Sequence, residues 1–384
     1  MSFLDLAIVC AAALAGPLLA TPRGWRVPVV LGELLAGLVL GRTGLGVLDA
    51  ADPTFTFLGG LGFVLVMFVA GTHVPVRDPR LPAALRTGSL RAALVGLVAV
   101  ALGYAVAHLV DTPHALLYAV LMASSSAAIV LPAVDSLGLD GPDLVDLLPQ
   151  VAIADSLCIV LLPLVIDSAH VARAALGAVA VLAAGVVLLV LLRWVERSGL
   201  RRRVHHVSEE RGFAVELRVS LAAVFAMAAL AVSTHVSLML AGFVSGLAVA
   251  AVGEPRRVAK QLFAVTEGFF GPLFFVWLGA TLQLRDLVDH PAMIVLGLCL
   301  GAGAALAHLV AVGLGQPPAY AFLAAAQLGV PVAAATVGTQ LGVLESGEGA
   351  ALVLGALVAL AVTVVGGLLA LRRRAPGPLA APTA

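Results

Sequence analysis

Charge is what this sequence has least of. Charged residues make up only 11% of its 384 residues, whereas an ordinary soluble domain carries about a quarter. Hydrophobic residues make up 61%, and the mean hydropathy is +1.09. A soluble domain is therefore excluded. Basic and acidic residues are equal in number, 22 of each, and without a basic excess the chain is not expected to bind nucleic acid.

Cysteine is also scarce. Cys10, Cys158 and Cys299 all lie in apolar runs, with neither a pairing pattern nor the spacing of metal ligands. We expect them to be small buried hydrophobes, and we expect no cofactor.

Long apolar runs fill most of the chain, and a helix needs about 20 residues to cross a bilayer. The sequence predicts an all-α polytopic membrane protein, a single transporter domain over 1–384 embedded in the lipid bilayer. Its first half covers about 1–192, a polar cytoplasmic linker 193–212, the second half 213–372 and a short cytoplasmic tail 373–384. Thirteen spans are predicted, near 3–22, 27–48, 55–75, 88–110, 114–136, 144–166, 171–192, 213–233, 235–252, 261–283, 291–313, 318–343 and 348–370.

The arginines predict the orientation. With thirteen spans, most basic residues fall on one side, including Arg201–Arg203 in the linker and Arg372–Arg374 at the end. Cytoplasmic loops carry such an excess, so the N-terminus is predicted outside and the C-terminus in the cytoplasm of a bacterial inner membrane. The first span lacks a basic leading segment and is interpreted as a membrane helix, not a cleaved signal peptide.

Asp155 is the strongest candidate functional residue. It lies at the middle of the sixth span, in the run VAIADSLCIVLLP. A carboxylate at this depth is a functional candidate by default, and a structural one would need a partner. No lysine or arginine lies near it in the sequence.

Ser124, Ser125 and Ser126 lie in the fifth span and are followed by Pro132. One interpretation is ordinary helix packing through small residues. The other is an interrupted helix whose carbonyls and hydroxyls line a cavity, the only setting in which a membrane tolerates such backbone. With Asp155, these groups form a set of hard oxygen ligands suited to a monovalent cation and not to a soft metal.

The two halves share a weak internal sequence similarity. Residues 126–139 read SAAIVLPAVDSLGL and residues 332–344 read VAAATVGTQLGVL, with helix breakers at Pro132 and at Gly329 with Pro331. Paired discontinuous helices of a structural repeat have this character. The span count makes the repeats inverted.

Other residues are weaker candidates for supporting roles. Glu33 and Glu267 are equally well explained by structural roles, and His308 by a place in the core. Four aspartates below the fifth span form either a solvated loop or an acidic funnel for cations: Asp135, Asp140, Asp143 and Asp146. The candidate supporting residues are Gln150, which could hydrogen-bond inside the core, Ser156, Glu33, Glu267, His308 and Pro331.

Four segments resemble one family in the same order and spacing, over roughly residues 5–370. They are VPVVLGELLAGLVLGRTGLG, FLGGLGFVLVMFVAGTHVPVRDPRL, STHVSLMLAGFVSGLAVA and FFGPLFFVWLGATLQL. They are similar to segments of the monovalent cation:proton antiporter-2 group, which includes Kef-type potassium efflux proteins.

The resemblance implies a homodimer in which a six-helix core domain moves against a dimerisation domain. It also implies two crossing broken helices beside a carboxylate, and Ser124–Ser126 and Asp155 match those positions. Three departures are notable. Ala154 stands where the family has Asp, Asn or Gln, which favours one cation per proton. The eleventh span has no lysine or arginine, and His308 does not align well with that position. Residues 329–332 read GVPV where the family has a charged motif.

The sequence therefore predicts an antiporter that exchanges Na⁺ or K⁺ for H⁺, with both ions competing for Asp155. The residues do not decide whether the exchanged cation is Na⁺ or K⁺. One alternative is a cation channel or uniporter of the same fold without proton coupling. Another is a non-transporting membrane sensor or scaffold. An enzyme is not expected, because the serines have no plausible base nearby. The Kef-type regulatory domain is expected to be absent, because the chain ends at Ala384.

Overall fold

The computed structural model describes residues 1–21, 29–72, 81–139, 141–166, 171–199, 213, 215–234, 236, 238–253, 262–282 and 285–373. Every regular element within these ranges is a helix, which confirms the predicted all-α class. A chain in lipid must satisfy its backbone polar groups internally, and a helix does so within one segment. Many of the arginines used to predict the orientation, including Arg201–Arg203, lie outside the described residues.

Ten described helices are long and apolar enough to cross a membrane. Three further expected spans coincide with shorter helices: α3 (Val29–Leu40), α12 (Leu238–Val252) and the pair α6 (Ala115–Ala123) and α7 (Ala127–Ser136). The count of thirteen therefore stays a prediction. The ten are Phe3–Ala20, Pro53–Thr72, Leu85–Val110, Asp146–Ile166, Ala175–Arg197, Val215–Ser233, Leu262–Thr281, Pro291–Leu314, Pro318–Leu341 and Glu348–Arg373.

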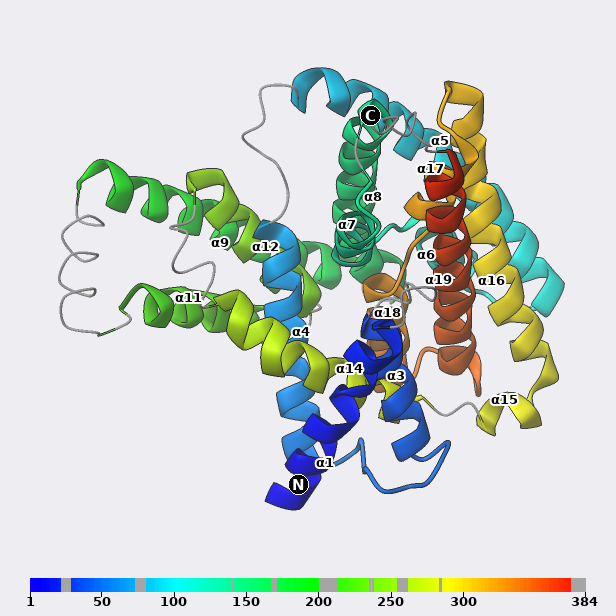
Figure 1. Cartoon of the computed structure of the whole chain (residues 1–384), viewed down its shortest axis with the longest axis horizontal. Helices are drawn as coiled ribbons and strands as arrows, with labels where there is room; N and C mark the ends of the chain where they lie inside the picture. The colour runs from blue at the N-terminus through cyan, green and yellow to red at the C-terminus, as the bar shows by residue number, and fades with distance from the viewer. Residues whose placement is uncertain are drawn as a thin grey trace, which may run out of the picture.

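One group of helices packs through glycine. We call α3, α4 (Pro53–Thr72), α12 and α14 (Gly271–Thr281) the glycine bundle. A Cβ on Gly37 of α3 would lie 2.1 Å from the carbonyl oxygen of Val276, and one on Gly246 of α12 would lie 2.0 Å from that of Phe68. Only glycine allows backbones to approach this closely. Three more helices extend this group in Figure 1: α1 (Phe3–Ala13), α9 (Val171–Arg197) and α11 (Val215–Ser233).

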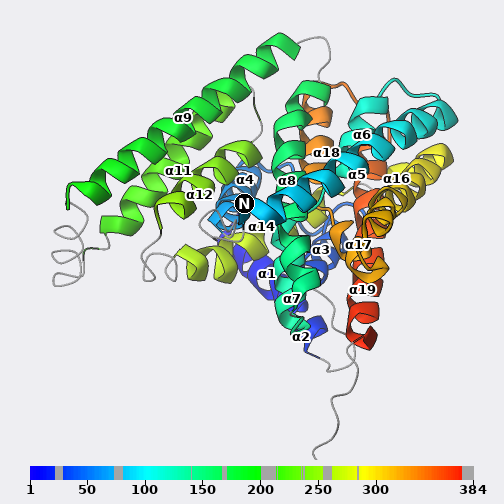
Figure 2. The same cartoon turned by 90° about the horizontal axis from the view of Figure 1, so that it is seen from above.

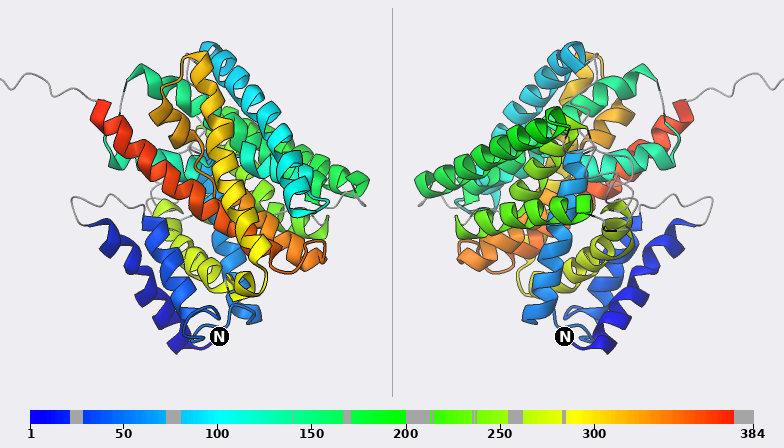
Figure 3. Two further views of the ribbon diagram at one scale, coloured as in Figure 1. Left: turned by 90° about the vertical axis from the view of Figure 1, so that its right-hand side faces the viewer. Right: turned by 90° about the vertical axis from the view of Figure 1, so that its left-hand side faces the viewer.

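The second group contains the broken helices, and we call it the crossing bundle. In Figure 2 it lies on the opposite side of the molecule from α9 and α11. The side views in Figure 3 show α19, in red, running along this group beside α16. Its members are α5 (Leu81–Val110), α6, α7, α8 (Pro142–Ile166), α16 (Pro291–Leu309), α17 (Pro318–Ala324), α18 (Gly329–Leu341) and α19 (Glu348–Arg373).

Two local expectations need correction. The first helix breaks at Ser124–Ser126, and Pro132 lies inside α7; the second breaks before Gly329, so that the GVPV run forms the first turn of α18. Proline is tolerated in a first turn because its missing N–H would have no partner there. Cys158 is buried and Cys299 partly so, but Cys10 lies on the exposed surface of α1, where its apolar run faces outward and not into a core.

Candidate functional site

Two interrupted helices meet at the centre of the crossing bundle. After α6, the backbone of Ser124 turns to an extended conformation with φ −70° and ψ 149°, and α7 begins at Ala127. α17 ends at Ala324, and α18 begins at Gly329. The three serines of the first break are all buried. The helix is therefore interrupted at the serine run, as the sequence predicts, and the lining of a cavity by these serines stays a prediction.

Side chains of one break bond to the other break. The Ser124 hydroxyl lies 2.9 Å from Oε1 of Gln327 and 2.8 Å from the carbonyl oxygen of Leu121. The Ser125 hydroxyl donates to the carbonyl of Ala324, the last residue of α17. Free carbonyls at helix C-termini carry partial negative charge, and free amides at N-termini carry partial positive charge. The crossing brings ends of both kinds together in the membrane interior.

Asp155 lies beside this crossing. It is on α8, is 5% exposed, and its Oδ2 accepts a hydrogen bond of 3.0 Å from the backbone N–H of Ala127. Ala127 is the first residue of α7, so the positive end of this half-helix faces the carboxylate. The fifth and sixth spans thus meet at the residues that the sequence analysis paired.

His308 adds a third helix to the site. Nδ1 of its ring lies 2.9 Å from the carbonyl oxygen of Ala304, one turn earlier on α16. Because a carbonyl only accepts, Nδ1 carries the proton in the neutral ring and Nε2 is the acceptor. Nε2 lies 3.5 Å from the Ser125 hydroxyl. The eleventh span therefore presents a histidine to the crossing although His308 does not match the family's basic residue in the sequence.

The remaining candidates near the crossing differ in what they contact. Ser126 is 4% exposed and lies in the first break. Ser156 follows Asp155, but its hydroxyl donates to the carbonyl of Ala152 on the same helix, at 2.6 Å. Pro331 is buried in the first turn of α18.

The other three candidates lie away from Asp155. Glu33 is buried on α3 of the glycine bundle, and a Cβ on Gly16 would lie 2.8 Å from its Cγ. Glu267 is exposed, in a π-helical turn over Thr266–Phe270. Gln150 hydrogen-bonds inside the core as expected, because its Oε1 accepts from Nε2 of Gln316 at 2.9 Å.

The sequence analysis did not identify Gln327. It also did not identify a group of contacts among Glu348, His114 and Tyr118 at the start of α6, which we call the outer brace. A glutamine inside the apolar run before Gly329 was the available signal for Gln327. The brace centres on Glu348 of α19, which is fully buried. Its Oε1 accepts from the Tyr118 hydroxyl at 2.7 Å and lies 2.8 Å from Nδ1 of His114. The contact with Glu348 raises the pKa of the His114 imidazole.

A cavity of about 580 Å³ opens between the two bundles. We call the side on which residues 41–56 and 343–350 lie the outer side, after the predicted orientation. The cavity runs from those loops past Trp277 of α14 to Val332 in the first turn of α18. It therefore ends about one helical turn from the second break.

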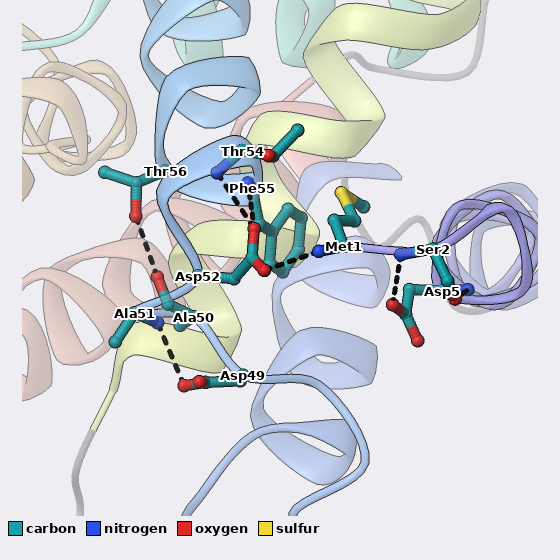
Figure 4. Close-up of polar contacts among 10 residues, drawn as sticks. All are labelled: Met1, Ser2, Asp5, Asp49, Ala50, Ala51, Asp52, Thr54, Phe55 and Thr56. Carbon is teal, nitrogen blue, oxygen red and sulfur yellow. Dashed lines mark hydrogen bonds and ion pairs between the residues drawn. The ribbon is translucent and has the colours of Figure 1, made fainter.

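The loop before α4 lines the outer end of this cavity. Figure 4 shows the Asp52 carboxylate accepting from the backbone N–H groups of Thr54 and Phe55 and from the amine of Met1. These bonds cap the start of α4, and the Met1 amine lowers the pKa of the Asp52 carboxyl. The neighbouring Ala50 accepts from Nε1 of Trp277 at 3.2 Å, which ties the loop to α14.

Comparisons with known proteins agree with this geometry. The profile of the family described as "Sodium/hydrogen exchanger, transmembrane" matches residues 9–371. A putative Na⁺/H⁺ antiporter of Bacillus subtilis, YjbQ, is 24% identical over 93% of this chain and 61% of its own length. The glutathione-regulated potassium-efflux system protein KefC of Salmonella arizonae is 29% identical over 75% of this chain and 47% of its own length. The chain thus spans about half to three fifths of these two relatives.

A solved structure has the same fold. It is an electron-microscopy structure of the sodium proton antiporter MjNhaP1 from Methanocaldococcus jannaschii. The TM-score is 0.68 at 16% sequence identity, covering 97% of this chain and 98% of that one. At this identity the match shows a common architecture.

Proposed function

The chain belongs to the sodium/hydrogen exchanger family, and from this premise we propose that it exchanges a monovalent cation for protons across a membrane by alternating access. Asp155 is the group for which the cation and the proton compete. The observation that carries the proposal is the position of this carboxylate at the crossing of two broken helices, where the N–H of Ala127 contacts it. An interruption of this kind at membrane depth lines a path for ions.

The ligands at the crossing suit an alkali cation. The hydroxyls of Ser124, Ser125 and Ser126 and the carbonyls freed by the breaks are hard oxygen donors, which such cations prefer. The backbone N–H of Ala127 offsets part of the negative charge on Asp155. A bound cation is therefore held by this single carboxylate and by neutral oxygen ligands. His308 and Gln327 support the site by holding Ser125 and Ser124 in place.

Exchange follows from competition at one carboxylate. When it is ionised, Asp155 binds a cation; when it is protonated, it is neutral and releases the cation. If each state crosses the membrane and the empty ionised state does not, one cation moves against one proton. Ala154 beside Asp155 provides no second carboxylate, which favours this one-for-one stoichiometry.

The relatives' names leave the cation open between sodium and potassium, and we propose that either ion can enter the site. We further propose that the chain is a single transporter domain that works as a homodimer in a bacterial inner membrane, with its N-terminus outside. Crosslinking in native membranes tests the dimer. Labelling of single cysteines placed near residues 46 and 199 tests the orientation, because the two positions must face opposite sides.

Proteoliposome exchange tests the proposed function. Vesicles that contain an interior pH dye receive a Na⁺ or K⁺ gradient, and Asp155→Asn is compared with wild type. Asparagine keeps the size and polarity of the side chain but can neither bind a proton in its place nor neutralise a cation. We expect cation-driven proton flux to be lost.

Glu33→Gln is the matched control. It neutralises another buried carboxylate, but on α3 of the glycine bundle, so proton flux should persist. An Asp155→Asn protein that exchanges at the wild-type rate refutes the assignment of this residue. Cation flux without proton movement in wild type replaces antiport by the channel function, and no flux of any alkali ion favours the sensor or scaffold.

A further inference from the structure

A second polar cluster lies in the crossing bundle, apart from Asp155. It is formed where α5, α8 and the turn between α16 and α17 come together. Its members are Arg91 of α5, Gln150 of α8 and Gln316, which precedes α17, and each is at most 5% exposed. Asp146, one turn before Gln150, lies at its edge and is 42% exposed. By the predicted orientation this is the inner side.

A few contacts tie the cluster together, and those of Arg91 are long. Arg91 donates to the carbonyl of Leu314 at 3.4 Å and lies 3.6 Å from the Asp146 carboxylate. Gln316 donates to Gln150 at 2.9 Å. A Cβ on Gly88, one turn from Arg91, would lie 2.8 Å from the backbone nitrogen of Gln150, so α5 and α8 touch directly here.

Three polar atoms of this cluster are buried without a hydrogen-bond partner in the described part of the chain. They are Nε of Arg91, Nε2 of Gln150 and Oε1 of Gln316. The first two are donors and the third is an acceptor. Buried groups of this kind almost always have a partner, and an exception requires an explanation. Three in one cluster point to a ligand that can both donate and accept.

We propose that this cluster is a water-binding vestibule that hydrates the inner side of the path to Asp155. A single water can accept from Nε2 of Gln150 and donate to Oε1 of Gln316, and a second can accept from Nε of Arg91. Gln150 precedes Asp155 by five residues on α8, a rise of about 7.5 Å. That distance is about three hydrogen-bond lengths.

Alternating access gives these unpaired atoms a role. The cavity between the bundles is open from the outer loops to α18, on the opposite side of the crossing. In alternating access only one side is open at a time. Opening of the inner side gives the polar atoms of the vestibule access to water. Their unpaired burial disfavours the closed inner side and so promotes opening.

Water suits this cluster better than either kind of ion. The guanidinium of Arg91 repels a cation, and Asp146 repels an anion while it neutralises Arg91. A neutral ligand that donates and accepts matches the three unpaired atoms without a charge penalty.

The test uses variants of the full-length protein that separate the effect of side-chain volume from the effect of the amide group at the two glutamines. Gln150→Met with Gln316→Met keeps the side-chain volume but removes every unpaired amide atom. Gln316→Ala removes the amide and leaves room for water. We expect the double variant to exchange about tenfold more slowly than wild type with an unchanged half-saturation for the outer cation, because the outer-open state gains stability. Gln316→Ala should slow exchange clearly less than the double variant does.

Hydrogen–deuterium exchange provides a readout that does not depend on transport. Peptides covering 146–152 and 310–318 should take up less deuterium in the double variant than in wild type. Ser245→Ala, which removes a buried hydroxyl in α12 that bonds to its own helix, is the matched control and should change neither measurement. If the double variant does not fold, Gln316→Met against Gln316→Ala makes the same comparison.

The inference rests on the proposed exchange, but the two fail separately. If wild type moves no protons, the proposed function fails. The difference in deuterium uptake between wild type and the double variant then still tests whether the cluster binds water. If wild type exchanges and the double variant has the same rate and uptake, the cluster is a structural contact and the inference is overturned. Equal slowing by Gln316→Ala and Gln316→Met also overturns it.

Discussion

The glycine bundle and the crossing bundle both contain close glycine contacts, but the crossing bundle also links its helix ends by buried hydrogen bonds. In the first, backbones meet at glycines such as Gly37 and Gly246, with no room for a Cβ. In the second, hydroxyls and amides such as those of Ser124 and Gln327 link helix ends across the interior. A close apolar contact has one tight arrangement. Hydrogen bonds can exchange partners with ions or water, so the crossing bundle is the part that can bind, release and rearrange.

The largest expected effect comes from breaking the glycine bundle. Gly246→Leu forces α12 and α4 apart, because even a Cβ would lie 2.0 Å from the carbonyl oxygen of Phe68. We expect a loss of about 3 kcal/mol of stability, with little folded protein recovered in detergent. Size-exclusion chromatography and thermal unfolding measure it.

Gly96→Ala is the matched control for that variant. Gly96 lies in α5, and a Cβ there meets nothing within 4 Å. The thermal midpoint should be equal to that of wild type or slightly higher, since alanine favours a helix. Comparable losses for both substitutions would mean that the close approach at Gly246 does not stabilise the glycine bundle.

The next effect separates binding from folding within the crossing bundle. Ser125→Ala removes a hydroxyl that contacts Ala324 and His308, whereas Ser156→Ala removes one that bonds only to its own helix at Ala152. We expect the exchange rate to fall about tenfold in the first, which is about 1.4 kcal/mol, and to change little in the second. Initial exchange rates at saturating cation measure both effects. A larger loss of rate in Ser156→Ala than in Ser125→Ala would assign the binding site to the Ser156 region of α8.

A smaller effect should come from the link between the two breaks. Ser124→Ala and Gln327→Leu each remove one side of a buried contact of 2.9 Å. In a double-mutant cycle we expect a coupling free energy of about 1 kcal/mol, measured by thermal unfolding. Coupling near zero would show that the breaks are held by packing alone, as in the glycine bundle.

The smallest effect concerns the outer brace. The pKa of His114 is raised by its contact with Glu348. The protonated form is therefore favoured in the folded protein, and its contribution to stability is complete below the unfolded pKa of about 6.5. That contribution is lost as the pH rises through the folded pKa. The thermal midpoint of wild type should fall between about pH 6 and pH 9, by the equivalent of about 1 kcal/mol.

His114→Gln keeps a donor towards Glu348 but does not titrate in this range. Its thermal midpoint should therefore be flatter with pH than that of wild type. An identical pH dependence in both proteins would assign the effect to another group.

Much of this protein could be predicted from local sequence alone. Apolar run length sets the membrane spans because the bilayer has a fixed thickness. The cost of a charge in lipid singles out Asp155, and three serines in a row predict the break before α7. The similarity between residues 126–139 and 332–344 indicates the second broken helix, although the interruption lies before Gly329 and not at Pro331.

The tertiary structure alone decided which distant groups meet. Gln327 lies about 200 residues from Ser124, and His308 is similarly far from Ser125, so no periodicity along one helix connects them. The same is true of Glu348 with His114 and of Gln316 with Gln150. In a chain with so few polar groups, each buried one must find its partner wherever the helices cross. Sequence therefore identified the charge at the centre, and the packing of helices selected the residues that surround it.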